Sequence, residues 1–505
     1  MEKEQVIRPI QGNILLVTIF ISGAVVMILE IVGIRAFAPF FGTSIYVWTA
    51  IIGVVLTSMS AGYYFGGRIA DKSASIHNYS WLLLLSSVVL SMVGMLIFPV
   101  MMVISLMPLS MPLRGFVGAV VLFAAPAFIL SMTAPYALKL MLRTLEEAGK
   151  TSGKVSSLSA AGSIVGTFLA GFVFIPMFGN TNIICGLAFL MFAAGVAVQP
   201  NLKHLKFKII CLLALIVSTL SGSYMVNAVH GATIEARETP YNTVWVIETI
   251  QGERPAINMV IGLARQSVMY LDSDELVGEY TRTFSQVAQH FMPNANNTLM
   301  LGGAGHIFSQ YFLRNNSTAG MDVVEIDEVL TELAKAHFGL ADTIELVGDR
   351  LNIYHEDGRA FLNRNTKRYD IIFSDVADAA NQPFHLFTSE ATQRVVRSLA
   401  DDGIFVANVV NALEGNQSNF LRAYIRTLRR YFPHVYVFSP QEVPVDTIQN
   451  VVLVAARRQL ELNSEAPFYN ELQVQRYIGD MRTDLPILRD NHAPTEFYNR
   501  FILIR

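Results

Sequence analysis

The chain has 505 residues, of which 52% are hydrophobic and only 15% are charged, whereas ordinary soluble domains carry about 25% charged residues. The net charge of -3 gives no basic field that would attract nucleic acid, so we expect no nucleic-acid partner. Cys185 and Cys211 both lie in apolar stretches of the first half. Their position excludes a disulfide scaffold and a cysteine-based zinc site in the second half.

The first 230 residues are nearly all apolar, and they predict a bundle of transmembrane helices. Seven stretches reach the roughly 20 apolar residues that a span needs, and they cover about residues 13–34, 45–67, 80–105, 115–140, 156–178, 181–199 and 208–229. The fifth stretch is rich in small residues, which let helices approach closely in lipid. The short link at residues 178–180 predicts a tight hairpin of the fifth and sixth stretches, and Pro126 and Pro135 are expected to kink the fourth.

A short motif at residues 66–72, Gly-Gly-Arg-Ile-Ala-Asp-Lys, follows the second stretch. It resembles the loop between the second and third helices of major facilitator transporters. That resemblance implies a transporter-like bundle that could be more than an anchor. The alternative is a tight turn that carries topology-setting charges.

The second half has the composition of a soluble α/β protein. Residues 236–271 form short runs rich in β-formers and predict a small antiparallel sheet, and a helix is expected over residues 279–290. Strands and helices then alternate, with strands expected near residues 298–301, 321–327, 351–354, 369–375 and 403–408. This alternation predicts a doubly wound, Rossmann-like sheet. The predicted domains are a helical bundle over 1–230, a small β region with a linking helix over 231–295, and the Rossmann-like domain over 296–505.

Glycines and acids stand where the predicted parallel strands end, which is the edge at which such sheets bind ligands. The successive strands are followed by Gly302, Gly303 and Gly305; by Glu325 and Asp327; by Asp357 and Gly358; and by Asp375. Glycines let a ligand lie against backbone amides at a helix N-terminus, and an acid after the second strand can accept hydrogen bonds from ribose. Phe308 stands where a dinucleotide site needs a third glycine. The pattern therefore favours an adenosyl sulfonium cofactor on a methyltransferase-type sheet.

These motifs, with Gln266-Ser before them and Leu386-Phe-Thr-Ser-Glu390 after them, have the order and spacing found in spermidine synthases (polyamine aminopropyltransferases). The chain resembles that family over about residues 237–440, and its fusion to a multi-span half resembles the membrane-bound branch. The resemblance implies transfer of an aminopropyl group from decarboxylated S-adenosylmethionine to an amine such as putrescine. No metal is expected, because the histidines of this half have no ligand-like spacing.

The resemblance also implies roles for individual residues. The nucleoside would be held by Gln266, Gly302, Gly303, Gly305, Glu325, Asp327, Asp357 and Gly358. Asp375 would be the catalytic proton acceptor, a role that suits a carboxylate facing an amine nucleophile. Asp378 would contact the amine substrate, and His306, because it stands at the glycine-rich loop, is a second expected substrate contact.

The sequence departs from the family pattern mainly in the amine half of the site. The family's first loop reads Gly-Gly-Gly-Asp-Gly-Gly, but Ala304, Gly305 and His306 stand at its third to fifth positions. The family's Tyr-His-Glu after the β region is also absent. Two other functions therefore stay open: an S-adenosylmethionine-dependent methyltransferase, and a non-catalytic membrane sensor or transporter with a nucleoside- or polyamine-binding domain.

The expected location is the cell membrane, with the lipid bilayer as a partner and several passes through it. Lys and Arg gather in alternate loops, which places the N-terminus in the cytoplasm and, after seven spans, the soluble domain outside. A domain that uses a cytosolic cofactor is expected inside, so the two arguments disagree. Spermidine synthases are commonly dimers, and the resemblance extends that arrangement to this chain as a homodimer.

Overall fold

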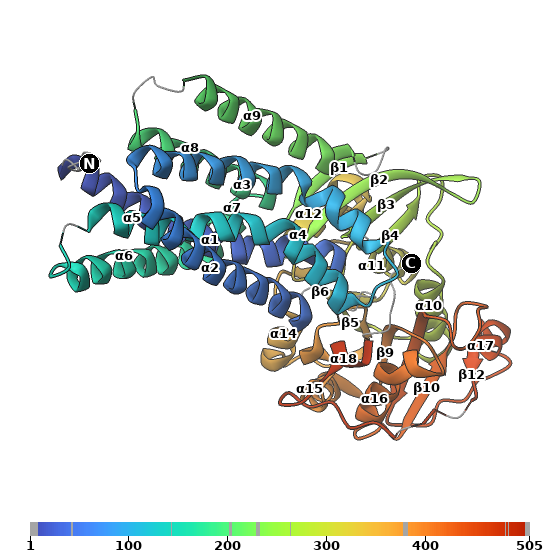
Figure 1. Cartoon of the computed structure of the whole chain (residues 1–505). Coiled ribbons are helices and arrows are strands. Elements are labelled where there is room, and N and C mark those ends of the chain that lie inside the picture. The colour runs from blue at the N-terminus through green and yellow to red at the C-terminus, as the bar shows by residue number, and fades with distance from the viewer. Residues whose placement is uncertain are drawn as a thin grey trace. The chain divides into compact units, whose positions relative to one another are not determined.

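The computed structural model describes residues 9–41, 44–142, 144–200, 205–228, 233–262, 264–376, 382–479, 481–482 and 484–499. The chain forms two compact units (Figure 1). The first comprises Met1–Gly231 with Glu238–Asn242, and the second comprises Ala232–Arg237 with Thr243–Arg505.

The first unit is built from long apolar helices. They are α1 (Pro9–Phe41), α2 (Ile45–Ser73), α3 (Ile76–Ser105), α4 (Met111–Ser131), α5 (Thr133–Met141), α6 (Ala148–Leu169), α8 (Asn180–Val198) and α9 (Leu205–Ala228). A π-helical turn, η1 (Ala170–Phe174), joins α6 to the short helix α7 (Ile175–Met177). Counted as continuous segments, the described residues contain seven helices that are long and apolar enough to cross a membrane by length and composition. They coincide with the seven predicted stretches.

Small residues of α6 bring its backbone against α1, as the sequence predicts. A Cβ atom at Gly162 would stand 2.0 Å from the carbonyl oxygen of Phe20, and one at Gly166 would stand 2.5 Å from that of Ala24. The fourth stretch is divided at Met132 into α4 and α5, and Pro135, which has no N–H to donate, lies in the first turn of α5. The helix α4 continues through Pro126 without a break.

Two expectations for this unit need correction. The link between α7 and α8 is short, but α6 packs mainly on α1 and α8 packs mainly on α3, so the two segments do not make the expected packed hairpin. Residues 66–72 are not a loop, because α2 continues through them to Ser73. Within this motif Asp71 forms an ion pair with Lys139 of α5 at 2.9 Å.

The second unit begins with the predicted small antiparallel sheet. Its order is β1-β2-β3-β4, and its strands are β1 (Thr233–Glu238), β2 (Thr243–Gln251), β3 (Arg254–Ile261) and β4 (Ala264–Tyr270). The expected helix follows as α10 (Glu279–Phe291).

A larger sheet of eight strands follows, in the order β12-β10-β11-β9-β8-β5-β6-β7. Its parallel strands are β5 (Asn297–Leu301), β6 (Gly320–Val324), β7 (Leu351–Tyr354), β8 (Tyr369–Ser374) and β9 (Leu399–Asn411), with antiparallel β10 (His434–Phe438), β11 (Gln449–Ala456) and β12 (Arg476–Tyr477). The connecting helices are α11 (Ile307–Asn315), α12 (Glu328–His337), α13 (Leu340–Val347), α14 (Gly358–Arg364), α15 (Ser389–Ser398), α16 (Asn419–Leu428), α17 (Tyr469–Gln475) and α18 (Thr495–Asn499). Strand order reverses between β5 and β8, so the loops after these two strands open side by side.

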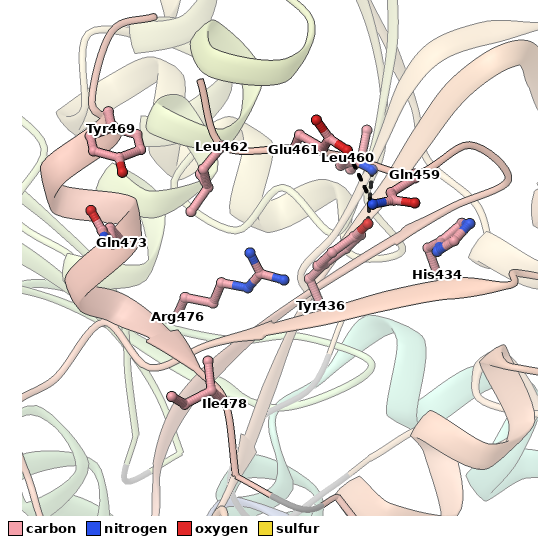
Figure 2. Close-up of a pocket in the computed structure, with 10 residues that line it drawn as sticks. All are labelled: His434, Tyr436, Gln459, Leu460, Glu461, Leu462, Tyr469, Gln473, Arg476 and Ile478. Carbon is pink, nitrogen blue, oxygen red and sulfur yellow. Dashed lines mark hydrogen bonds between the residues drawn. The ribbon is translucent and has the colours of Figure 1, made fainter. Parts of the chain in front are cut away.

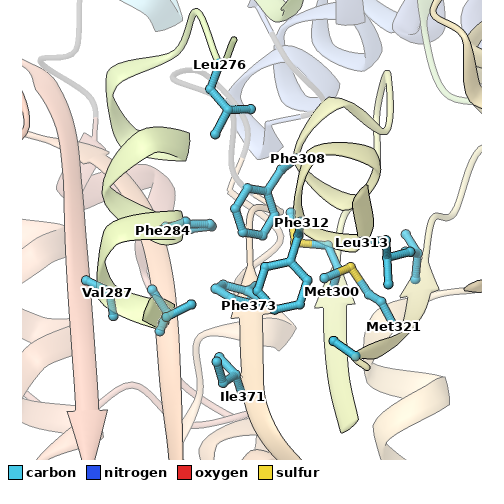
Figure 3. Packing of buried hydrophobic residues seen from close by; sticks show 14 of the residues in the cluster. Leu276, Phe284, Val287, Met300, Phe308, Phe312, Leu313, Met321, Ile371 and Phe373 are labelled. Atoms are coloured by element: carbon cyan, nitrogen blue, oxygen red, sulfur yellow. The ribbon is translucent and has the colours of Figure 1, made fainter. Parts of the chain in front are cut away.

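Alternate residues of the strands point into two separate cores, as expected for a sheet covered on both faces. Met300, Ile371 and Phe373 belong to one core, together with Phe284 of α10 and Phe308 of α11 (Figure 3). The rings of Phe308 and Phe373 pack edge to face, with centroids 4.8 Å apart. Strand residues of opposite parity join the other core, which α14, α15 and α16 cover. The predicted doubly wound α/β sheet is therefore present, and its rigid strands hold the loops that carry the site.

Candidate active site

The loop after β5 is shaped by its first glycine. Gly302 has a φ of +86°, and a Cβ atom there would stand 2.2 Å from the carbonyl oxygen of Asp375. Only glycine combines this left-handed backbone with so close an approach of the neighbouring loop. The Asp375 N–H also donates to the Leu301 carbonyl at 2.8 Å. Gly302 therefore holds the loops after β5 and β8 together.

Glu325 follows β6 and holds the next part of the same loop. Its Oε2 atom accepts hydrogen bonds from the backbone N–H groups of Gly303 at 2.8 Å and Ala304 at 2.9 Å, and its Oε1 atom accepts one from the N–H of Asp327 at 3.0 Å. The side chain is buried. Two carboxylate oxygens can accept about four bonds, so Glu325 retains capacity for a further donor such as a ribose hydroxyl.

Asp375 follows β8 and receives its hydrogen bonds from side chains. The Tyr280 hydroxyl donates to Oδ2 at 2.8 Å, and the Asn408 amide donates to Oδ1 at 3.0 Å. The same Asn408 amide group donates to Oδ1 of Asn450 at 3.1 Å. All of these donors are neutral, and no described residue forms an ion pair with Asp375 that would offset the cost of holding the carboxylate away from water.

The electrostatics of Asp375 follow from this setting. Burial raises the pKa of Asp375, and the hydrogen bonds from Asn408 and Tyr280 offset only part of that rise. Burial and the nearby Asp375 carboxylate raise the pKa of the Tyr280 hydroxyl well above its usual value. Tyr280 therefore stays protonated and donates, and Asp375 has the increased proton affinity that a general base needs.

A pocket of about 330 Å³ lies over these loops. Four of the sequence-predicted residues line it, namely Gln266, Gly302, Gly303 and Asp375, and Tyr280 and Asn450 line it as well. Its volume falls at the lower end of the roughly 300–1,000 Å³ of small-molecule sites. Gly305 lies beside the pocket, where its N–H donates to the Ser267 hydroxyl at 3.0 Å.

The other predicted nucleoside residues are not among the residues that line the pocket. Asp327 is the N-cap of α12, and its side chain accepts from the Val329 N–H at 3.1 Å. Asp357 is the N-cap of α14, which begins at Gly358, and it also lies 2.8 Å from Nε2 of His385. Burial acts to raise the pKa of Asp357, but the contacts with His385 and the N–H of Ala360 outweigh it and lower the pKa.

The loop after β5, residues 302–305, is called the glycine loop below. His306 is buried beneath this loop and does not line the pocket. It occupies the left-handed region with a φ of +56°, and its Nε2 atom is 3.0 Å from the Thr331 hydroxyl. Nε2 of His355 lies 3.1 Å from the same hydroxyl. Burial, together with the charges of His355 and Lys335, lowers the pKa of His306 to about 3. This position suits a neutral residue that supports the loop.

Asp378 lies outside the described residues, so its predicted contact with the amine stays a prediction. Three residues of the site were missed in the sequence: Tyr280, Asn408 and Asn450. Asn408 could have been found, because it is a buried amide in the otherwise apolar run of β9. Tyr280, in the first turn of α10, carries no comparable signal.

The family and the curated relatives that follow are named for one chemistry. Residues 278–458 match the family described as the spermine/spermidine synthase domain. A polyamine aminopropyltransferase of Alkaliphilus metalliredigens is 29% identical over 177 residues, which are 34% of this chain and 60% of that protein. One from Streptococcus pneumoniae is 26% identical over 209 residues, covering 40% of this chain and 68% of that protein. The second unit thus contains a region similar to the spermine/spermidine synthase domain, and the curated relatives named here are transferases.

The first two curated relatives are matched over about 60% of their own length. Among solved structures, a probable spermidine synthase from Corynebacterium glutamicum is 20% identical with a TM-score of 0.41, covering 48% of this chain and 86% of that chain. A spermidine synthase in complex with the transition-state analogue AdoDATO is 17% identical with a TM-score of 0.39, covering 45% of this chain and 75% of that chain. The matched family region lies wholly within the second unit.

Proposed function

We propose that this protein is a membrane-bound aminopropyltransferase that uses decarboxylated S-adenosylmethionine to alkylate an amine such as putrescine. The observation that carries the proposal is Asp375. Its carboxylate faces the pocket that the loop after β5 also lines, the donors that hold it in the described part of the chain are neutral, and burial raises its pKa. The aminopropyltransferase names of the curated relatives support the same chemistry.

The reaction needs a free amine beside an electrophilic carbon. An acceptor ammonium group loses one proton to Asp375, and the resulting nitrogen lone pair attacks the aminopropyl carbon bound to the sulfonium. A C–N bond forms and the C–S bond breaks, with its electron pair going to sulfur, so methylthioadenosine leaves as a neutral thioether. Tyr280 and Asn408 hold the carboxylate toward the amine, which fixes the direction of proton transfer.

The donor side of the proposal rests on the glycine loop. Glu325 is buried against the loop and is not among the residues that line the pocket. It has acceptor capacity beyond its three backbone donors and would bind the ribose hydroxyls, and Gln266 lines the pocket. Asp357 and Gly358, at the start of α14, would meet the adenine. His306 would act on the donor through the loop that it supports.

The acceptor side is less charged than the chemistry of a diamine would suggest. Two of the residues that line the pocket are acids, the exposed Glu279 and the partly buried Asp375, and Arg265 lines the pocket as well. An acceptor with one reactive amine therefore needs only Asp375, whereas a diamine would also have to use Glu279 or Asp378. We infer that acceptor preference is set mainly by what the far end of the amine meets.

We further propose that the seven helices of the first unit span the cell membrane and that the catalytic unit faces the cytoplasm, where the donor is available. The loop charges favour the opposite side. Protease protection in inside-out vesicles tests this directly. We expect the second unit to be digested in these vesicles and protected in right-side-out vesicles. The reverse pattern would overturn the cytoplasmic assignment.

The activity itself is tested with the full chain in detergent. The protein is incubated with putrescine and either decarboxylated or intact S-adenosylmethionine, and products are followed by mass spectrometry. We expect methylthioadenosine only with an amine and the decarboxylated donor, and far less of it from Asp375→Asn than from the wild type. S-adenosylhomocysteine from the intact donor would instead show a methyltransferase. Nucleoside binding without turnover of any amine would show a binding protein.

A further inference from the structure

A second pocket, of about 730 Å³, lies elsewhere in the second unit, and it shares no lining residue with the pocket at Asp375. It is bounded by β10, by β12 with helix α17 before it, and by the segment that follows β11 (Figure 2). Nothing in the proposed transferase chemistry uses these elements.

Three planar side chains form a row along this pocket. Tyr436 is the middle one, and the Arg476 guanidinium stands over its ring at 5.2 Å from the centroid. The imidazole of His434 stacks near Tyr436, with centroids 6.5 Å apart and planes inclined by 18°. His434 and Tyr436 are two residues apart on β10, so they share one face of the strand. The row therefore offers a flat surface that ends in a cation.

The back of the pocket is fixed by its own hydrogen bonds. The Tyr436 hydroxyl accepts from the Leu460 N–H at 2.8 Å, which anchors the segment after β11. The Gln459 amide donates to the Glu461 carboxylate at 3.2 Å, and Figure 2 shows these two side chains turned toward each other. The acid of the pocket is thus already paired with an amide of the protein.

Side chains on the opposite side of the pocket have hydrogen-bonding groups without a partner among the described residues. Arg476 is only partly exposed, yet within the described part of the chain no protein group accepts a hydrogen bond or forms an ion pair with its guanidinium. Figure 2 shows this guanidinium extending into the space between Tyr436 and the side of α17 that carries Gln473. Among the described residues, no group forms a hydrogen bond with the side chains of His434, Tyr469 or Gln473. A half-buried guanidinium without a hydrogen-bond acceptor among the described residues is suited to a carboxylate or phosphate, which it can bind through two parallel bonds.

We propose that this pocket is a second ligand site, which takes a small molecule with a flat aromatic ring and an attached phosphate or carboxylate. The oxyanion binds the Arg476 fork, the ring lies along Tyr436 and His434, and Gln473 and Tyr469 donate to the remaining polar atoms. The site is independent of the transferase reaction. It does not require a nucleoside, because its specificity comes from the pairing of an anion with a ring.

The proposal is tested with the full chain in detergent by isothermal titration calorimetry with phenyl phosphate. Inorganic phosphate supplies the anion alone, and benzyl alcohol supplies the ring alone. We expect saturable binding of phenyl phosphate, weaker binding of phosphate, and none of benzyl alcohol. Arg476→Gln should weaken phenyl phosphate binding by about tenfold or more, because it removes charge-assisted bonds. The matched control is Arg397→Gln, which alters an exposed arginine of α15 outside the pocket and should bind like the wild type.

Two further variants keep the test decisive. Arg476→Lys retains the charge without the fork and should bind several-fold more weakly than the wild type, so it replaces Arg476→Gln if that variant does not fold. His434→Ala shortens the row of rings and should weaken phenyl phosphate but not inorganic phosphate. The proposal is overturned if the wild type shows no saturable binding at millimolar phenyl phosphate, or if the folded Arg476 variants bind it as tightly as the wild type.

Discussion

Glu325 and Asp375 are both carboxylates at the carboxyl ends of strands in one sheet, but they are held in opposite ways. Glu325 is buried and accepts three bonds from backbone N–H groups. Asp375 opens onto the pocket and accepts its bonds from the side chains of Tyr280 and Asn408. The fixed backbone donors suit a group that shapes a loop. Burial raises the pKa of Asp375, and the hydrogen bonds from the two side chains offset only part of that rise.

The comparison predicts that converting each carboxylate to its amide impairs a different property of the protein. Loss of Asp375 should act on the chemical step, and loss of Glu325 should act on the loop and on donor binding. Four variants separate these effects, and they are ordered by the size of the change expected.

Asp375→Asn should cause the largest loss of activity. The amide cannot accept the acceptor's proton, and loss of a general base typically costs about 10²- to 10⁴-fold in rate. We expect kcat to fall by that factor while KM for the donor changes little, because donor contacts lie on the glycine loop. Steady-state kinetics with methylthioadenosine as the measured product gives both constants.

A loss confined to KM would contradict this role of Asp375. The matched control is Asn450→Asp, since Asn450 lines the same pocket and accepts from Asn408 without touching Asp375 in the hydrogen bonds of the described residues. That variant adds a carboxylate nearby, so it should raise the pKa of Asp375 without removing the base. Its activity should therefore recover as the pH is raised, whereas that of Asp375→Asn should not.

Glu325→Gln should cost less in kcat and more in donor binding. One end of the new amide must present N–H groups to backbone N–H groups that now donate to Glu325, so at least one buried donor loses its partner. Such a loss costs about 1–3 kcal/mol, which corresponds to roughly 5- to 150-fold in donor affinity if the loop is the element that moves. Equilibrium binding of methylthioadenosine and thermal unfolding measure the two parts.

Asp370→Asn is the control for that variant. A single oxygen of Asp370 accepts from the backbone N–H groups of Asn296 and Asn297, which an asparagine oxygen can also do, and Asp370 does not line the pocket. It should leave both donor affinity and stability near the wild-type values. If Glu325→Gln binds the nucleoside as the wild type does, the assignment of Glu325 to the donor half is wrong.

Tyr280→Phe should shift the pH dependence of the rate. The Tyr280 hydroxyl lowers the pKa of Asp375 by donating to its ionised form, so removing that hydroxyl raises the pKa further. Since the base must be ionised to accept a proton, activity is lost as the pH falls through this pKa. We expect the acidic limb of the kcat/KM profile to move to higher pH, with a smaller loss at alkaline pH than at neutral pH. An unchanged acidic limb would show that Tyr280 does not affect the pKa of the general base.

The two sides of the site also differ in how far the sequence reveals them. The strands β5, β6 and β8 could be predicted because each is a short apolar run followed directly by glycine or an acid. The positions of Gly302 and Glu325 at the site can therefore be predicted from the local sequence. The partners of Asp375 do not, because Tyr280 is 95 residues away and Asn408 is 33 residues away along the chain. Only the folded sheet brings them together.

The helical unit shows the same limit at a coarser level. Apolar length alone located all seven long helices, because that property is local. It could not predict that α8 packs on α3 rather than beside α6, or that α2 runs through residues 66–72.

In the second unit, the sequence did not reveal the antiparallel strands β10 to β12, since they depend on pairing with β9 and with one another.

His306→Asn should produce the smallest change, and it tests whether the glycine loop needs support from below. Asparagine tolerates the left-handed backbone at this position, so the variant removes mainly the contact with Thr331. We expect KM for the donor to rise a few-fold with kcat nearly unchanged. Rescue of donor binding by His306→Gln, whose amide can also reach a hydroxyl, would support a positioning role rather than a purely steric one.

The same histidine has a signature in stability that a ligand-binding role would not give. Its pKa in the folded state is about 3, against a usual value of 6.5. Its neutral form therefore contributes stability above pH 6.5, and this contribution is lost as the pH falls toward 3, because the unfolded chain then binds the extra proton. Thermal unfolding of His306→Asn should depend less steeply on pH below 6.5 than unfolding of the wild type. If instead the His306 ring titrates near its usual value in NMR spectra of the folded protein, it is not the buried support of the loop.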